Sequence, residues 1–215
     1  MQIKKNNSRN SMRNIILSLI MFVSSMASAQ GVADVWINKT IEKLQNKGSE
    51  ISFRIDEDGM RLSGKLLMDD NKFFYDAGTI KIWFDGTTQW TLQTDAGYSE
   101  LYINEPNLED LQIINPYLLL KHYKDFFTIS DGGEKSINGK LAHMVKLNAI
   151  DNSVVSSVNV YIANDNTPIA VELVLPDGMV YEIEMRSMRN GLTFPKNTFT
   201  YPEKEYPANE VIDMR

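Results

Sequence analysis

Hydrophobic and polar residues alternate along most of this chain, with the period of two that is typical of β-strands. Ile51, Phe53 and Ile55 alternate with polar neighbours, and the alternation resumes from 60 to 68 after an acidic turn that ends at Gly59. This pattern predicts a β-hairpin. Further strands are expected at 73–75, 80–84, 90–92, 126–129, 142–147, 154–162, 169–175 and 179–185.

Turn signals separate these expected strands. Asp85-Gly86-Thr87-Thr88 follows 80–84, Gly132-Gly133 follows 126–129, and Asp177-Gly178 precedes 179–185. Such Asp and Gly combinations favour tight reversals of the chain. Phe194 and Phe199 indicate a last extended piece. Seven aromatic residues between 73 and 98 fit the pleated, half-buried surface of a sheet (Phe73, Phe74, Tyr75, Trp83, Phe84, Trp90, Tyr98).

Two segments have a helical period instead. From 32 to 47 the apolar residues Ala33, Ile37, Ile41 and Leu44 share one face, and Gly48 is expected as the stop signal. From 104 to 125 one or two short helices are expected, with Pro116 at a first helical position.

The second helical segment is apolar around most of its circumference at Leu118-Leu119-Leu120. A surface helix would show only an apolar stripe, so this helix either packs on two sides or faces a cavity. The elements together predict an α+β fold, mainly antiparallel β, with roughly ten strands and two or three helices in one domain.

The N-terminus has the pattern of a secretory signal peptide. Basic residues between Lys4 and Arg13 precede an apolar run from 15 to 23, and Ala27-Ser28-Ala29 forms a small-residue cleavage site. The apolar run is too short for a bilayer, which needs about 20 residues. We therefore expect residues 1–29 to be removed and residues 30–215 to form the mature domain, exported from the cytoplasm and not anchored.

The charge of the mature chain narrows the choice of partners. The signal segment contains four of the 22 Lys and Arg residues and none of the 28 Asp and Glu residues, so the mature chain has 18 basic against 28 acidic residues. A net charge of −10 argues against nucleic acid or an anionic membrane as the main partner. We expect the protein to act as a monomer.

Residues for catalysis or metal binding are scarce. The chain has no cysteine and two histidines, His122 and His143, without a metal-binding spacing. It has neither a phosphate-binding loop nor a dinucleotide glycine pattern. Asp69-Asp70 is a weak candidate for a carboxylate pair, and the acidic turn at 56–59 is a plain turn rather than a calcium loop. We expect no metal, no cofactor and no enzymatic activity.

The many apolar side chains of the expected strands and of the apolar helix allow two interpretations. They fill an ordinary core, or they enclose a dry cavity that binds acyl chains by burial, at about 0.8 kcal/mol per CH₂ group. Strands next to the apolar helix point to five candidate lining residues, with their faces dependent on register: Leu66, Phe73, Tyr75, Ile82 and Trp90.

Five segments, taken in order, resemble one known family. They are Gly64-Lys65-Leu66, Asn71 to Tyr75, Asp85 to Trp90, Asn115 to Leu120, and the end of the chain from Phe199 to Arg215. Over nearly the whole mature chain the sequence resembles the LolA-type periplasmic carriers of outer-membrane lipoproteins. The resemblance implies an unclosed β-barrel covered by short helices, with an apolar cavity between them. It also implies that the end of the chain, Phe199 to Pro202 and then Val211 to Arg215, forms a closing strand.

The resemblance also implies a mechanism and partners. Tyr117, Leu118, Leu119 and Leu120 would form the lid, and the protein would shield lipoprotein acyl chains between an inner-membrane lipoprotein-releasing transporter and an outer-membrane acceptor. Typical members have an Arg just before a Pro in the second strand pair, and this Arg holds the lid by hydrogen bonds. The matching place here reads Asp69-Asp70-Asn71, so that latch is absent.

Two other functions remain open on the residues. A regulatory protein of the same fold would bind lipid or mislocalised lipoprotein and signal to a membrane partner. A secreted hydrolase would need one of the two histidines.

Overall fold

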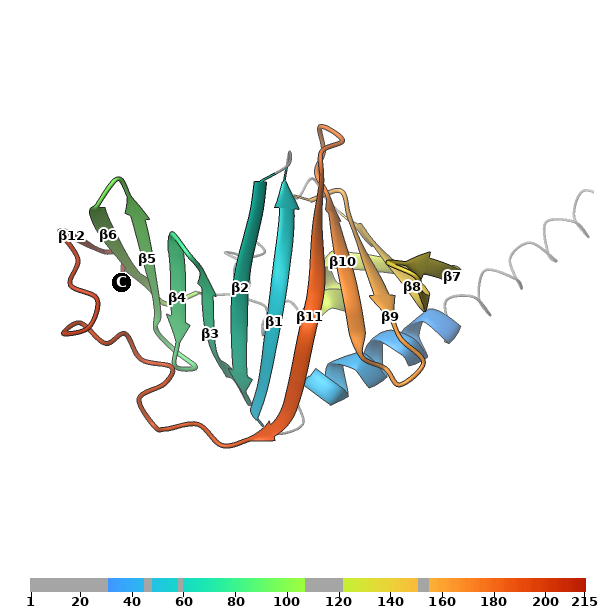
Figure 1. Cartoon of the computed structure of the whole chain (residues 1–215), viewed down its shortest axis with the longest axis horizontal. Helices are drawn as coiled ribbons and strands as arrows, with labels where there is room; N and C mark the ends of the chain where they lie inside the picture. The colour runs from blue at the N-terminus through green and yellow to red at the C-terminus, as the bar shows by residue number, and fades with distance from the viewer. Residues whose placement is uncertain (1–30, 45–47, 58–59, 107–121, 151–154) are drawn as a thin grey trace, which may run out of the picture.

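The described residues form a single curved β-sheet with one long helix on its concave side (Figure 1). The structure is a computed structural model that describes residues 31–44, 48–57, 60–106, 122–150 and 155–215. The signal segment expected at 1–29 therefore lies outside the described residues. One or two short helices were expected within 104–125, and most of that segment, residues 107–121, also lies outside the described residues. Residues 122–126 form a short helix.

The sheet has twelve strands, in the order β12-β6-β5-β4-β3-β2-β1-β11-β10-β9-β8-β7. All neighbours are antiparallel except β12, which runs parallel to β6. The bounds are β1 Gly48–Glu57, β2 Met60–Asp69, β3 Lys72–Ala77, β4 Ile80–Phe84, β5 Gln89–Asp95, β6 Tyr98–Asn104, β7 Phe127–Ile137, β8 Lys140–Ala149, β9 Ser157–Ile162, β10 Pro168–Val174, β11 Val180–Leu192 and β12 Glu210–Asp213.

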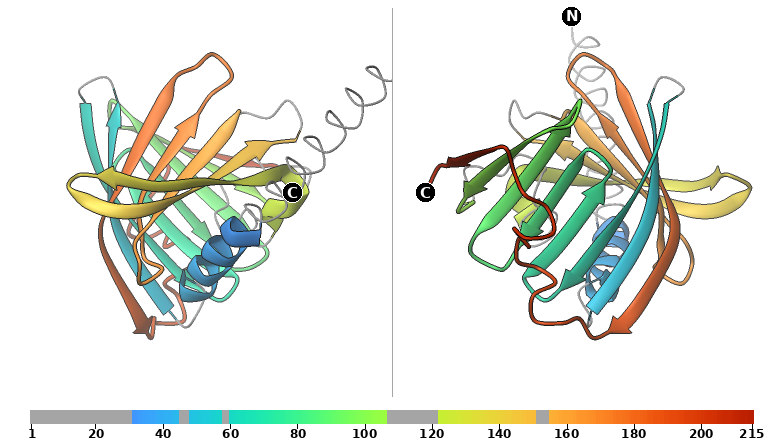
Figure 2. Two further views of the ribbon diagram at one scale, coloured as in Figure 1. Left: turned by 90° about the vertical axis from the view of Figure 1, so that its right-hand side faces the viewer. Right: turned by 60° about the vertical axis from the view of Figure 1, so that its left-hand side comes forward.

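The expected fold class is confirmed: the sheet is mainly antiparallel, it is not closed, and helices lie on it. Figure 2 shows how strongly the sheet curves around the N-terminal helix at 31–44. The described residues form twelve strands where the alternation predicts about ten, because the segment after 92 forms a full hairpin of β5 and β6. The short strand β12 lies at the end of the chain, where the resemblance implied a closing strand.

The sheet consists of two antiparallel meanders joined at one seam. In the first meander, strands β1 to β6 follow one another as neighbours, and in the second meander strands β7 to β11 do the same. The seam is the pairing of β1 with β11 between the two. A register shift between Ser52 and Phe53 places one extra residue, Arg186, on β11. A bulge of this kind increases the local twist of a strand, which helps the sheet to curve at the seam.

A C-terminal segment at 193–209 covers part of the convex face. This segment connects β11 to β12, and on its way it runs back along the outside of the sheet (Figure 1). Phe199, Tyr201 and Tyr206 pack around Trp83 and Leu92. The rings of Trp83 and Tyr201 meet edge to face at 5.3 Å, a favoured arrangement of aromatic pairs. This face of the sheet is therefore a packed core on β2 to β6.

Three local expectations were wrong. Gly48 does not stop the helix but begins β1, where a Cβ atom would lie 2.3 Å from the carbonyl oxygen of Leu192. Gly132-Gly133 is not a turn but a bulge within β7, since the register shifts between Asp131 and Gly133. The reversal lies at Asn138-Gly139, where both residues have positive φ, as a two-residue hairpin turn requires. Phe194 and Phe199 belong to the irregular C-terminal segment rather than to a strand.

Candidate functional site

The strand register assigns each side chain to one of two faces. Residues directly opposite each other share a face, and successive residues in a strand alternate between faces. One inner row crosses the sheet through Met188, Ile51, Leu66, Tyr75 and Ile82. On the other meander Val171, Val160 and Val145 are partners on the same concave side as the helix. We call this concave side the inner face.

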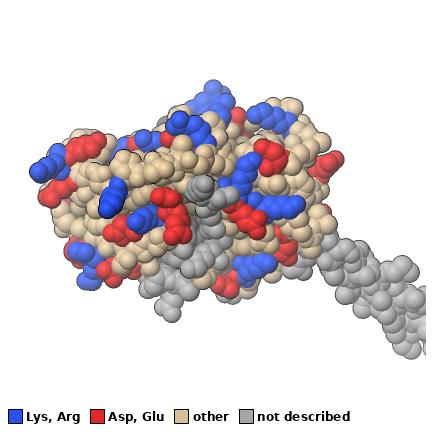
Figure 3. All heavy atoms as spheres, turned by 90° about the horizontal axis from the view of Figure 1, so that it is seen from below, with Lys and Arg blue, Asp and Glu red and all other residues tan. Residues whose placement is uncertain are grey.

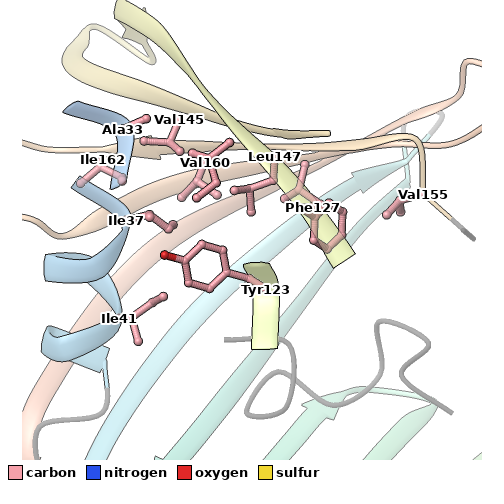
Figure 4. Close-up of a cluster of buried hydrophobic side chains, with 12 residues drawn as sticks. Ala33, Ile37, Ile41, Tyr123, Phe127, Val145, Leu147, Val155, Val160 and Ile162 are labelled. Atoms are coloured by element: carbon pink, nitrogen blue, oxygen red, sulfur yellow. The ribbon is translucent and has the colours of Figure 1, made fainter. Parts of the chain in front are cut away.

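One end of the inner face is closed by the N-terminal helix. The expected helical stripe is confirmed, because Ala33, Ile37, Ile41 and Leu44 are all buried. The first three pack against β7, β8 and β9 together with Tyr123 from the short helix at 122–126. Figure 4 shows these side chains pointing toward one another between the helix and the strands. Tyr123 also donates a hydrogen bond to Asn38 Oδ1 at 2.8 Å, which joins the two helices.

Trp36 and His143 fix the helix on the sheet at this end. Their rings stack at 4.8 Å with an interplanar angle of 10°. His143 Nε2 lies 2.8 Å from Asp131 Oδ1 on the neighbouring strand, and Asp131 also accepts a hydrogen bond from the backbone of Gly133. His143 therefore contacts both the helix, through Trp36, and the β7 bulge, through Asp131.

A second buried cluster occupies the inner face of the first meander. Phe73 is 0% exposed, and Met68, Ile82 and Phe84 are buried beside it on β2, β3 and β4. Leu66 and Tyr75 pack against this cluster and are partly exposed. Burial raises the pKa of Tyr75, and the negative charge of Asp76 raises it further, so this phenol is neutral at physiological pH. The cluster thus presents no charge to the concave side.

A half-buried apolar stripe lies between the two clusters. Ile55 on β1 pairs with Ile183 on β11, and Phe53 pairs with Met185, while Met188 lies opposite Ile51. Ile55, Ile183, Met185 and Met188 are all partly exposed, unlike their buried neighbours Ile51 and Phe53. The stripe continues to the rim, where Leu62 and Ile80 are 40% and 39% exposed. Partly exposed apolar side chains gathered on one face favour an apolar ligand.

Four of the five candidate lining residues lie on this inner face. Leu66, Tyr75 and Ile82 are partners in one row, and Phe73 belongs to the adjacent row. Trp90 does not join them, because it pairs with Trp83 on the convex face and packs against the C-terminal segment. Whether the four bind a ligand stays a prediction. The expected lid residues Tyr117, Leu118, Leu119 and Leu120 lie outside the described residues.

The inner face becomes polar on β5 and β6, a feature that sequence reasoning missed. Thr91 and Tyr102 continue the row of Tyr75 and Ile82, while Gln89 and Asn104 continue the row of Phe73 and Phe84. The signal was present in the alternation of Gln89, Thr91 and Gln93. From the sequence alone, this alternation is typical of a strand edge that faces solvent. The register shows instead that these residues share a face with the buried cluster.

The surface offers little else that resembles a site. Figure 3 shows basic and acidic side chains interspersed over the face seen from below, without a large field of one sign. Within the described ranges, no three or more His, Cys, Asp or Glu residues are grouped so that they could hold a metal ion. Among the described helices, none has both the length and the apolar character needed to cross a bilayer.

A comparison with protein families now places this geometry. The profile of the family described as outer membrane lipoprotein carrier protein LolA matches residues 23–170. The chain belongs to this family. The LolA-type resemblance expected from the sequence is thereby confirmed, and the curved sheet with a helix on its concave side is the LolA-family fold in this chain. The comparison with curated proteins finds no match.

Three solved structures illustrate the likeness. A conserved protein from Thermus thermophilus has 11% identity and a TM-score of 0.55, with 82% of this chain and 96% of that chain covered. A LolA superfamily protein from Nitrosomonas europaea has 13% identity, a TM-score of 0.41, and coverage of 79% and 97%. A chain of the Pseudomonas aeruginosa MucA/MucB complex has 13% identity, a TM-score of 0.42, and coverage of 79% and 60%. At these identities the likeness concerns the fold alone. Of the three structures, the Thermus protein supports the shared fold, because its TM-score is 0.55.

Proposed function

We propose that this LolA-family protein binds the acyl chains of lipoproteins on its inner face and carries them through the periplasm without chemistry. One observation carries the proposal. The half-buried stripe of Ile55, Ile183, Met185 and Met188 lies between two buried clusters on the concave side of the sheet. Methionine side chains adapt to chains of different shape, which suits a carrier with more than one cargo.

The incomplete burial of the stripe agrees with a carrier that must release its cargo. Full burial of an acyl chain of about 16 carbons would contribute on the order of 12 kcal/mol, at about 0.8 kcal/mol per CH₂ group. A dissociation constant near 1 μM corresponds to only about 8 kcal/mol. A face that leaves its apolar side chains partly open to water supports affinity in the micromolar range rather than a permanent complex.

Titration of a fluorescent fatty-acid probe tests the binding. We expect saturable binding at micromolar concentration, displaced by a triacylated lipopeptide. Met185→Glu would put a charge on the stripe and is expected to weaken binding at least about tenfold, since burying an unpaired charge is costly. Ser187→Glu is the matched control. Ser187 lies on β11 like Met185, but it is exposed and faces the convex side, where it pairs with Ser52 of β1. Equal affinity of both variants, or no saturable binding by the native chain, would contradict the proposal.

The carrier role needs a second experiment, because a regulatory lipid sensor would also bind the probe. We propose that the protein receives cargo from an inner-membrane lipoprotein-releasing transporter and delivers it to an outer-membrane acceptor. A carrier increases the transfer of a labelled lipoprotein from inner-membrane to outer-membrane vesicles, and it restores lipoprotein sorting in cells that lack their own carrier. A sensor does neither.

Export and the lid are two further parts of the proposal. We expect N-terminal sequencing of the periplasmic protein to begin at Gln30, after removal of residues 1–29, with 30–215 as the mature domain. For the lid we expect Leu119→Asp to change both probe affinity and thermal stability, with Leu118→Asp acting in the same direction. Unchanged binding and stability in both variants would remove residues 117–120 from the mechanism.

A further inference from the structure

Gln89 is a buried amide on the inner face. It is the first residue of β5, directly after the turn at Asp85 to Thr88, and it is 6% exposed. Its partner on β4 is Phe84, and its partner on β6 is Asn104. Gln89 thus continues the row that begins with Met68 and Phe73, and its side chain shares their face.

The amide of Gln89 is only half satisfied. Nε2 donates a hydrogen bond to Thr91 Oγ1 at 3.4 Å, whereas Oε1 is shielded from water and has no hydrogen-bond partner. If the amide were turned over, Nε2 would lack the partner instead, so one polar atom is unpaired in either orientation. Most buried polar atoms in proteins have a partner, and an exception needs an explanation.

The position of Gln89 suggests what the missing partner is. On one side lie the rings of Phe73 and Phe84, and on the other lie Thr91 and Asn104, which are partly exposed. Gln89 therefore stands at the boundary between the apolar and polar parts of one face. An amphiphile with its hydrocarbon on the apolar part would bring its first polar group to this boundary, with an approach past Thr91 and Asn104.

We propose that Gln89 is a polar anchor for the amide group of an N-acylated ligand. A secondary amide presents an N–H group and a carbonyl, so it can supply the partner that the Gln89 amide lacks in either orientation. An ether offers no hydrogen-bond donor and only a weak acceptor. This inference rests on the proposed function, and it adds to it the chemical class of the group that follows the acyl chain.

The test compares two ligands of equal chain length as displacers of the fluorescent fatty-acid probe. N-methylpalmitamide carries the amide, and methyl hexadecyl ether has nearly the same hydrocarbon without it. The native chain is expected to prefer the amide about tenfold, the effect of roughly one buried hydrogen bond. Gln89→Met, similar in length and apolar, should lose this preference with unchanged affinity for the ether. Gln93→Met is the control, because Gln93 is exposed on the same face of the same strand.

The outcomes separate the two proposals. If the probe itself does not bind, the proposed function fails. If the probe binds but the native chain does not prefer the amide, or Gln89→Met keeps the preference, the anchor is wrong and the carrier proposal is unaffected. Should Gln89→Met fold poorly, the preference of the native chain still tests the anchor, and Gln89→Leu provides a second variant.

Discussion

The rings of Phe53 on β1 and Tyr75 on β3 stack at 5.5 Å although β2 lies between their strands. The contact is possible because Gly64 on β2 has no side chain. A Cβ atom at Gly64 would lie 2.4 Å from Cζ of Phe53 and 2.5 Å from the carbonyl oxygen of Asp76. The stacked pair bridges the seam and the buried cluster of the first meander.

Gly64→Ala is therefore expected to destabilise the protein. The methyl group would displace Phe53 and strain the backbone, which typically costs about 1–3 kcal/mol in a packed core. Urea denaturation measures the change in the free energy of unfolding. Gly31→Ala is the control, because a Cβ atom there would meet nothing within 4 Å and Gly31 lies in a helix. A neutral Gly64→Ala variant would show that Phe53 does not need the space above Gly64.

The convex face should contribute to stability without contributing to ligand binding. Phe199 is 3% exposed and packs edge to face on Phe194. Phe199→Ala is expected to cost about 3–5 kcal/mol of the free energy of unfolding. Probe affinity, measured well below the unfolding transition, should equal that of the native chain. Lys204→Ala, exposed in the same segment, should change neither quantity. A loss of affinity in folded Phe199→Ala would place the ligand against the C-terminal segment instead.

The three tryptophans offer a direct test of which face takes the ligand. Trp36 stacks on His143 on the inner side, whereas Trp83 and Trp90 lie on the convex face. Brominated palmitate bound on the inner face is expected to quench Trp36 more than the other two. The double variant Trp83→Phe/Trp90→Phe should retain the quenching, and Trp36→Phe should lose most of it. The reverse pattern would move the binding site across the sheet.

An ion pair at the C-terminal end of the long helix predicts a pH dependence at acid pH. Hydrogen bonds from Thr167, and then from Lys43, lower the pKa of Asp165 from 3.8 to about 2. Lys43 Nζ lies 3.0 Å from Asp165 Oδ2 and so joins the helix to the β9–β10 hairpin. Since the folded pKa is lowered, this carboxylate stabilises the fold above about pH 4 and loses its effect as the pH falls to about 2.

Comparison of the native chain with Asp165→Asn measures this contribution. Asp165 is 67% exposed, so solvent screening keeps the difference in unfolding free energy below about 1 kcal/mol. The difference should be constant from pH 7 to about pH 4 and should vanish near pH 2. A difference that persists unchanged at pH 2 would show that the carboxylate charge is not its source.

The face of a strand proved harder to predict than the strand itself. The bounds of β4 agree with the sequence pattern, but Trp90 was grouped with Ile82 although it lies on the opposite face. The reason is physical: the C-terminal segment covers the convex face, so both faces of β3 to β5 carry apolar side chains and alternation does not identify the inner one. Treating 85–88 as a four-residue loop would have paired Phe84 with Gln89 and Ile82 with Thr91.

The sequence predicted a feature correctly where residues close together in the chain determine it. The helical stripe from Ala33 to Leu44 was predictable because the period of burial on a helix is its own signature. Gly48 and Gly132 were misread because their role depends on a distant strand. A Cβ atom at Gly48 would meet Leu192, and one at Gly132 would meet the side chain of Met144 at 2.1 Å. Close approaches of this kind are not visible from neighbouring residues.

The two-meander architecture also predicts an order of folding. Each meander is built from hairpins between successive strands, which form quickly because their loops are short. The seam is different, since the hydrogen bond from Arg54 to Glu184 closes a loop of 130 residues. Because closing a loop of this length is entropically costly, we expect the joining of the two halves to be the slow step of folding. Because residues from both halves line the concavity, acyl-chain binding would appear only after this step, as a late event of refolding.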